Sequence, residues 1–378
     1  MRGSGFNIVR VFIDHGDVDR DDGIAARARS GLSSSYMNNV VTFIRDAASL
    51  GIYTVPTLEL FPSFVPRYAC NASAADAAHF PYPNAQIFVP GCVQAKSRYV
   101  SDFLSELRED LSSLAFVSIE NELSVDASVP PFMSRAAESV AESVAESVAE
   151  SVAESVAESV VTPANGKQYD MNNSSERLSL FEESARFWGT RVREAAKKID
   201  EEVLVACGMF TYAAVGKTFS AWRTMPSCSD RNDCRVPPRP SSMESVVDIL
   251  DVHVYQSPGW QGLKSDLDSS DWKSLGGGGG QGGKGGQGGP MTIATPTATP
   301  IVMGEFGAFR KNPAVFATGR AAGAAMVEQQ MESCVFGFRG WLFWTVDTWE
   351  QPRLWNFDSA PDIERLLSPK ERENPCAQ

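Results

Sequence analysis

Seven short runs of apolar and β-branched residues recur along the chain, and segments with helical periodicity separate them. The runs lie at residues 7–13, 52–60, 114–120, 203–210, 246–255, 300–306 and 340–346. Strands that alternate with helices are typical of a parallel sheet whose faces are covered by the helices. The sequence therefore predicts an α/β fold.

The segments between these runs carry helix signals. Residues 34–51 place apolar side chains at helical spacing and end at Gly51. In residues 172–200, Asn173 followed by Glu176 resembles a capping box, and basic residues gather near the end. We expect a further helix from about Pro313 to Cys334.

Two low-complexity segments interrupt this pattern. Residues 137–160 repeat "AESV" six times, and residues 276–289 contain eleven glycines. Four residues turn a helix by about 400°, so the repeated Val would circle a helix instead of forming a coiled-coil seam. With 378 residues, the chain has room for one barrel of roughly 250 residues with insertions, or for two smaller domains. We expect one domain, residues 1–378, with both segments as insertions: the repeat on the face at the strand ends, the glycine segment opposite.

Charge and composition exclude some partners. The formal net charge of −13 disfavours a nucleic-acid partner, because phosphate-binding surfaces need clustered Lys and Arg. No apolar run approaches the roughly 20 residues of a membrane span, and residues 1–14 lack the features of a signal peptide. Residues 17–23, "DVDRDDG", resemble a calcium loop, but the Gly stands one place late and Ala28 occupies the position of the usual Glu. We expect a monomer without metal or cofactor.

The seven cysteines bear on the compartment. Cys70 and Cys92 bracket a Pro- and Ala-rich segment, and Cys228 and Cys234 share a loop-like segment, so we expect two disulfides. Cys207 and Cys334 stand in apolar contexts and are expected to be core residues. Glycosylation sequons favour a secreted glycoprotein and begin at Asn71, Asn172 and Asn173. Reduced thiols in a cytosolic protein are the alternative.

Polar residues stand at the ends of several predicted strands. They are Arg10, Asn121, Glu122, His253, Tyr255, Glu305 and Trp344. In a parallel barrel the C-terminal ends of the strands share one face, so we expect these side chains to meet. Two carboxylates suit glycosidic cleavage, in which one carboxyl protonates the leaving oxygen and the other attacks the anomeric carbon. Arg and Tyr would keep the attacking carboxylate charged, and Trp offers a flat surface to a sugar ring.

Several of these motifs carry a family resemblance. "SIENEL", "DVHVY", "VMGEFGAF" and "GWLFWTVD", in that order after "FNIVRVFI", resemble the clan A glycoside hydrolases, in particular the cellulase and mannanase group called family 5. The resemblance runs from about residue 5 to 357. It implies a (β/α)8 TIM barrel and retaining cleavage of β-linked glucan or mannan, without a cofactor.

The resemblance also implies a role for each residue. Glu122 matches the acid/base, Asn121 the residue that binds the sugar 2-hydroxyl, and Glu305 the nucleophile. Arg10 matches the Arg that supports the nucleophile, His253 and Tyr255 match the pair on the sixth strand, and Trp344 matches the platform for the attacked sugar. Glu120, two residues before Glu122, is expected to face the barrel interior or a polar neighbour and receives no catalytic role.

The chain departs from the family pattern in three places, one of which is the "AESV" repeat described above. Arg10 matches the second family strand, so the first strand and its helix are expected to be missing, which would leave the last strand without its neighbour. Many family members carry a His near the position of Glu59, whose part in substrate binding stays open. The alternatives to a secreted hydrolase are a catalytically impaired carbohydrate-binding protein on a truncated barrel and a transglycosylase that uses the same residues.

Overall fold

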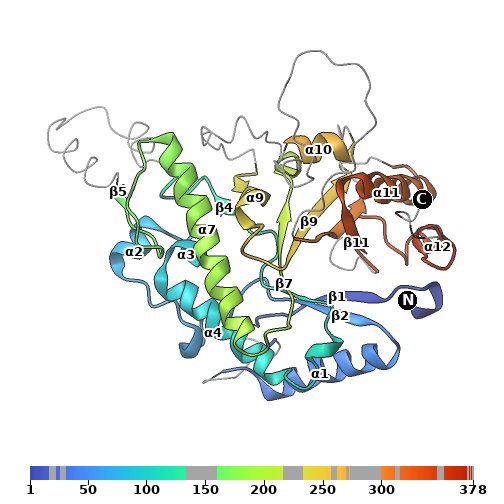
Figure 1. Ribbon diagram of the computed structural model, residues 1–378, viewed down its shortest axis with the longest axis horizontal. Coiled ribbons are helices and arrows are strands. Elements are labelled where there is room, and N and C mark those ends of the chain that lie inside the picture. The colour runs from blue at the N-terminus through green and yellow to red at the C-terminus, as the bar shows by residue number, and fades with distance from the viewer. Residues whose placement is uncertain are drawn as a thin grey trace, which may run out of the picture.

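Seven parallel strands form the centre of the computed structural model (Figure 1). Their order is β1 (Ile8–Phe12), β2 (Tyr53–Thr57), β3 (Val117–Ser118), β7 (Val205–Phe210), β9 (Ile249–Gln256), β10 (Ile301–Ala308) and β11 (Phe338–Phe343). The structure describes residues 1–378 except 17–22, 26–30, 133–159, 216–232, 257–261, 270–271, 273–298, 311–315, 347–352, 373, 375 and 377–378. Each strand overlaps one predicted run, which confirms the predicted α/β barrel architecture.

The middle strands of the sheet are more buried than the two end strands, β1 and β11. Every residue of β7 and of β10 is buried, as expected for a parallel sheet that packs on both sides. The register of β9 and β10 pairs His253 with Glu305 and Tyr255 with Gly307. The sheet thus brings polar residues of separate strands to one level.

The barrel is nearly closed. Among the described residues no backbone pairing joins β1 to β11, the two ends of the strand order. A cavity of about 90 Å³ lies between them, lined by Ile8 and Val9 on one side and by Trp341 and Phe343 on the other. At the carboxyl ends of these strands, the rings of Phe12 and Trp344 meet with centroids 5.2 Å apart. This seam is where the sequence predicted an unpaired edge.

Helices surround the sheet (Figure 1). The long ones are α1 (Ser34–Ser49), α4 (Pro90–Glu106), α7 (Ser174–Lys197) and α11 (Gly319–Ser333). The short ones are α2 (Ala74–His79), α3 (Ala85–Phe88), α9 (Pro240–Met243), α10 (Leu263–Ser269) and α12 (Pro361–Leu367). Ser368, which follows α12, donates a hydrogen bond from its hydroxyl to the carbonyl of Ser4 at 2.6 Å, so α12 lies beside the N-terminus.

The helix ends confirm some of the expected signals and correct others. Asn173 does cap α7, but its side chain accepts from the amide of Ser175 at 3.0 Å, in place of the amide at Glu176 that a capping box would use. The helix expected from about Pro313 begins at Gly319, because Thr318 accepts from the amide of Ala321 and caps it there. Residues 311–315 lie outside the described residues.

Two small antiparallel sheets lie in the loops outside the barrel. β4 (Val125–Asp126) pairs with β8 (Arg235–Val236), and β5 (Val160–Val161) pairs with β6 (Tyr169–Asp170). The first connects the loop after β3 to the segment after β7. It bears on the geometry of the candidate site.

Disulfides correct one prediction from the cysteine pattern. Cys70 and Cys92 are bonded, as expected, and Cys207 is free and buried. Cys334, expected to be a core residue, forms a disulfide with Cys376 instead, because the chain after α12 returns to the end of α11. Cys234 is also disulfide-bonded, and its expected partner Cys228 lies outside the described residues.

Two further observations concern the remaining expectations. None of the helices in the described ranges is long and apolar enough to cross a membrane. Both predicted insertions, apart from Val160, lie outside the described residues, as does most of the calcium-like segment.

Candidate active site

Glu305 lies on β10 with both carboxylate oxygens bound by protein donors. Nη1 of Arg10 donates to Oε1 at 2.8 Å, and the hydroxyl of Tyr255 donates to Oε2 at 2.6 Å. The residue is only 5% exposed. Burial, followed by the charge of Glu305, raises the pKa of Tyr255 well above its usual value, so Tyr255 keeps its proton and remains a donor. These two contacts fix the carboxylate in one orientation.

Arg10 joins four strands through its guanidinium. Nε donates to the hydroxyl of Thr57 on β2 at 2.8 Å, and Nη2 donates to Oδ1 of Asn121, beyond β3, at 2.9 Å. Nη1 contacts Nε2 of His253 on β9 at 3.1 Å in addition to Glu305 on β10. A planar guanidinium can serve several acceptors at fixed angles. The position of Glu305 is thereby tied to that of Asn121, the residue next to Glu122.

Strand β9 supplies three side chains to the same face, because residues two apart in a strand point the same way. These are Asp251, His253 and Tyr255. Nδ1 of His253 lies 3.4 Å from Oε1 of Glu122 and 3.5 Å from Oε2 of Glu305, and its Nε2 lies 3.7 Å from Asp251. Burial lowers the pKa of His253, and so does Arg10, whose Nη1 lies 3.1 Å from Nε2, but the three carboxylates outweigh both and raise it to about 9. We infer a cationic imidazole between the carboxylates.

Glu122 has an unusual backbone conformation for a residue other than glycine. Its φ is 51°, in the left-handed region, and such conformations persist where the surrounding structure holds them. The next amide, of Leu123, donates to the carbonyl of Gly208 at 2.8 Å. A side chain on Gly208 would stand 3.0 Å from Nε2 of His253 and 3.2 Å from the Glu122 amide. Glycine at this point of β7 therefore leaves room for the turn that presents Glu122.

The side chain of Glu122 pairs with two cations. Oε2 accepts from Nη1 of Arg235 at 2.6 Å, and Oε1 faces His253. Burial raises the pKa of Glu122, but His253 and then Arg235 outweigh it and lower the pKa to about 2. Glu122 is therefore a carboxylate in this arrangement.

The two glutamates lie close together. An oxygen of Glu122, an oxygen of Glu305 and a nitrogen of His253 all lie within 4.8 Å of one another. The carboxylate oxygens of these two glutamates already accept from Arg10, Tyr255 and Arg235. The arrangement therefore favours a network of ion pairs and hydrogen bonds over a metal centre.

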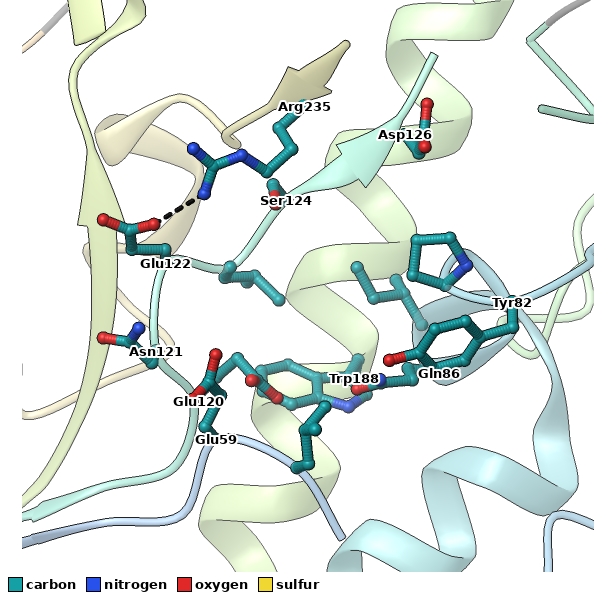
Figure 2. A pocket seen from close by; sticks show the side chains of 14 residues that line it. Glu59, Tyr82, Gln86, Glu120, Asn121, Glu122, Ser124, Asp126, Trp188 and Arg235 are labelled. Carbon is teal, nitrogen blue, oxygen red and sulfur yellow. Dashed lines mark hydrogen bonds and ion pairs between the residues drawn. The ribbon is translucent and has the colours of Figure 1, made fainter. Parts of the chain in front are cut away.

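A pocket of about 380 Å³ opens beside Glu122 (Figure 2). Its walls include Asn121, Glu122 and Arg235, and the opposite side carries Tyr82 and Gln86. Glu305 is not among the lining residues. The volume lies in the range of small-molecule sites, and its polar groups with the Tyr82 ring suit a sugar.

Glu59 and Glu120 also line this pocket. Nζ of the buried Lys96 donates to Oε2 of Glu120 at 3.1 Å and to the carbonyl of Glu59 at 2.9 Å. Burial raises the pKa of Glu120 to about 7 against the opposing effect of Lys96. Burial also raises the pKa of Glu59, while Asn121 acts in the opposite direction. Glu120 thus has the polar neighbour that the sequence predicted.

The structure brings six of the seven predicted site residues into one network: Arg10, Asn121, Glu122, His253, Tyr255 and Glu305. Trp344 follows β11 and is half-buried at the seam, where it lies with Arg10 and Gly304 around the narrow cavity. It does not line the larger pocket beside Glu122.

No protein-family model matches the sequence, and no curated protein matches it. Solved structures do match the fold. The hyperthermostable endo-1,4-β-D-mannanase from Thermotoga petrophila RKU-1 aligns at 13% identity and a TM-score of 0.51, over 97% of this chain and 91% of that one. An apo β-glucosidase, 1317, aligns at 14% identity and a TM-score of 0.50, over 97% and 84%.

The chain spans about half (52%) of the length of another match, the exo-β-1,4-mannosidase Op5Man5 from Opitutaceae bacterium strain TAV5, at 14% identity and a TM-score of 0.49. The matches at a TM-score of 0.50 or above show that the described chain has the barrel fold found in these glycosidases.

Sequence reasoning missed three charged residues of the site. Arg235 stands in a two-residue strand with no periodicity to reveal it. Lys96 lies among buried residues of α4, between Val93 and Tyr99, and a lysine on an apolar helix face was a readable signal. Asp251 stands two residues before His253, so strand parity alone could have placed it on the same face.

Proposed function

We propose that this protein is a retaining glycoside hydrolase that cleaves β-linked glucan or mannan. The observation that carries the proposal is the separation of Glu122 and Glu305, whose nearest oxygens lie within 4.8 Å. Retaining glycosidases hold their two carboxyls about 5–5.5 Å apart, whereas inverting ones leave about 6.5–9.5 Å for a water molecule. Oxygens of the two carboxyls within 4.8 Å of each other, with Glu305 oriented by Arg10 and Tyr255, support direct attack by one carboxylate.

Glu305 suits the role of nucleophile. It is nearly buried, and Arg10 and Tyr255 orient its two oxygens. In the first step one of these oxygens would attack the anomeric carbon while the glycosidic oxygen leaves, which forms a covalent glycosyl-enzyme. Arg10 and Tyr255 would release part of their hold as the negative charge moves into the new ester bond.

Glu122 suits the role of acid and base. In the first step its carboxyl would donate a proton to the departing glycosidic oxygen, and in the second its carboxylate would take a proton from the attacking water. The pocket beside it extends away from Glu305, so we assign that pocket to the leaving sugar. The form seen here, with Glu122 ionised, is the one required in the second step.

The rest of the network positions these two groups. Asn121 accepts from Arg10 through Oδ1, and its side chain also hydrogen-bonds Glu59, so Asn121 is held in place beside Glu122, where a sugar hydroxyl would bind. His253 lies between both carboxylates and compensates their charge. Trp344 is proposed as the apolar surface under the attacked sugar. The disulfides, which persist mainly in oxidising compartments, support secretion. We also propose that the single barrel domain acts as a monomer.

The experiment that tests the proposal is a hydrolysis screen against soluble glucan, mannan and xylan, with reducing ends as readout. We expect release from glucan or mannan that is lost in Glu305→Ala and in Glu122→Ala. For any substrate that is cleaved, proton NMR of the first product should show the β-anomer. An α-anomer would refute the retaining mechanism, and full activity in Glu305→Ala would refute the assignment of the nucleophile.

Two controls separate the alternatives. Analysis of products at high substrate concentration distinguishes hydrolysis from transglycosylation, which would yield longer oligosaccharides. Calorimetric binding of oligosaccharides to Glu305→Ala without turnover by the wild type would instead identify a carbohydrate-binding protein.

A further inference from the structure

A small sheet that the sequence does not predict brings Arg235 to Glu122. β4 pairs with β8 in an antiparallel register that places Val125 opposite Val236 and Asp126 opposite Arg235. Glu122 stands just before β4, so this pairing fixes the loop after β3 to the segment after β7. The guanidinium is thus brought to the carboxylate by backbone hydrogen bonds and not by a chance surface contact.

The guanidinium is held on three sides. Nη1 donates to Oε2 of Glu122 at 2.6 Å, and Nη2 donates to Oδ2 of Asp233 at 2.8 Å. Its carbon lies 4.9 Å from the centre of the Phe210 ring, a distance typical of a cation–π contact. The side chain is 48% exposed, while that of Glu122 is 24% exposed, so a molecule in the pocket can reach the pair.

We infer that Arg235 is a positioning residue that holds Glu122 in its carboxylate form and has to give up this ion pair before Glu122 can protonate a leaving group. The inference rests on the proposed function of Glu122 as acid and base. One oxygen of Glu122 faces Arg235 and the other faces His253, so each partner stabilises the ionised form of Glu122 over the protonated one. Arg235 therefore favours the base step and opposes the acid step.

The pocket indicates what releases the pair. Glu122 and Arg235 form the same wall (Figure 2), and a leaving sugar in the pocket competes with Arg235 for Oε2. The partly exposed guanidinium can turn towards Asp233, which already binds it through Nε and Nη2. Occupation of the pocket then permits protonation, and departure of the leaving sugar restores the carboxylate.

Other titratable groups lie around Glu122 and its partners. The strands β1, β9 and β10 contribute Arg10, Asp251, His253, Tyr255 and Glu305. The loops contribute Glu59 after β2, Glu120 after β3, and Asp233 beside Arg235. Of these, His253 is the other direct cationic partner of Glu122. Removal of Arg235 should therefore raise the pKa of Glu122, while His253 continues to favour the carboxylate.

The test is the ionisation of Glu122 itself, followed by carbon-13 NMR of protein labelled at the glutamate carboxyl carbon, with Glu122→Gln to assign the signal. We expect Arg235→Gln to raise the titration midpoint of Glu122 by roughly one pH unit or more, since an opposite charge at this distance shifts a carboxyl pKa by about 1–3 units. Arg235→Lys should restore most of the shift. Arg191→Gln, which alters an exposed arginine of α7, should leave the midpoint unchanged.

A kinetic test follows the same variants on a substrate that the wild type cleaves. The alkaline limb of kcat/KM should move to higher pH in Arg235→Gln for a poor leaving group, and stay in place for a dinitrophenyl glycoside, which needs no acid. An unchanged NMR midpoint in a folded Arg235→Gln protein would overturn the inference. An inactive wild type would overturn the proposed function alone, because the NMR titration requires no turnover.

Discussion

Tyr255 and Glu305 are joined by a hydrogen bond of 2.6 Å from the phenol to Oε2, across neighbouring strands β9 and β10. The register offsets the two residues, since Glu305 pairs with His253 and Gly307 pairs with Tyr255. A side chain on Gly307 would stand 3.1 Å from the Tyr255 ring. The ring of Tyr255 therefore packs on Gly307, and its hydroxyl reaches the carboxylate of Glu305.

The first prediction concerns this bond. Tyr255→Phe removes the donor while keeping the ring, and a hydrogen bond to a charged group contributes about 1.5–3 kcal/mol. If the bond orients the nucleophile for attack, kcat/KM should fall roughly ten- to a hundredfold. Steady-state kinetics on a substrate of the wild type measures the effect. Tyr53→Phe, at an exposed tyrosine of β2, is the matched control; a Tyr255→Phe enzyme as active as this control would contradict the prediction.

Much of the fold and part of the site could be predicted from the sequence, for a physical reason. Each central strand is an apolar run, and a polar residue at the carboxyl end of such a run lies on the face of the barrel where the strand ends meet. Glu122, His253 and Glu305 were found in this way. Arg235 and Lys96 were not, because they approach the site from a two-residue strand and from the middle of a helix.

The disulfide of Cys334 shows a second limit. Connectivity cannot be deduced from spacing, and the apolar neighbours of Cys334 suggested an ordinary core residue. Its partner Cys376 lies 42 residues further along the chain and reaches it only because α12 packs on α11. Tertiary packing decided the pairing.

A second prediction concerns Glu120 and pH. Burial raises its folded-state pKa to about 7, from an ordinary value of 4.5. Between these values the folded protein binds more protons than the unfolded chain, so stability falls as pH rises. This contribution of Glu120 to the unfolding free energy is fully present below pH 4.5 and is lost as the pH rises through 7. The loss amounts to about 3 kcal/mol.

Urea unfolding at several pH values tests this expectation. Glu120→Gln cannot ionise and should lose most of the decline in unfolding free energy between about pH 4.5 and 7. Glu106→Gln, at the exposed end of α4, should retain the decline of the wild type. Parallel curves for the wild type and Glu120→Gln would show that Glu120 does not titrate in this range.

A third prediction concerns the bond between Cys334 and Cys376. A disulfide stabilises largely by restricting the unfolded chain, and closure of a loop of 42 residues contributes about 4 kcal/mol. Cys334→Ala/Cys376→Ala should therefore lower the unfolding free energy by roughly that amount in denaturant titrations. Peptide mapping without reductant should recover Cys334 linked to Cys376, and a map that pairs either cysteine elsewhere would contradict the structure.

The last prediction concerns Gly304, the residue before Glu305. A Cβ at this position would stand 1.7 Å from Oδ1 of Asp251, and Asp251 is fully buried next to His253. Either the aspartate or β10 would have to move, which typically costs about 1–3 kcal/mol. The carbonyl of Gly304 also accepts from Nη1 of Arg10 at 3.1 Å, so a shift here disturbs the group that orients Glu305. We therefore expect Gly304→Ala to lose both stability and activity.

Gly340→Ala is the matched control for this change, because it adds the same methyl group to the neighbouring strand β11. There the new Cβ would meet Val302 at 3.4 Å, an ordinary contact distance. Thermal unfolding and kcat/KM of the two variants should separate clearly, with Gly340→Ala close to the wild type. If Gly304→Ala matched Gly340→Ala in both measurements, the close packing of Asp251 against Gly304 would not exist in solution, and Asp251 would be free to leave His253.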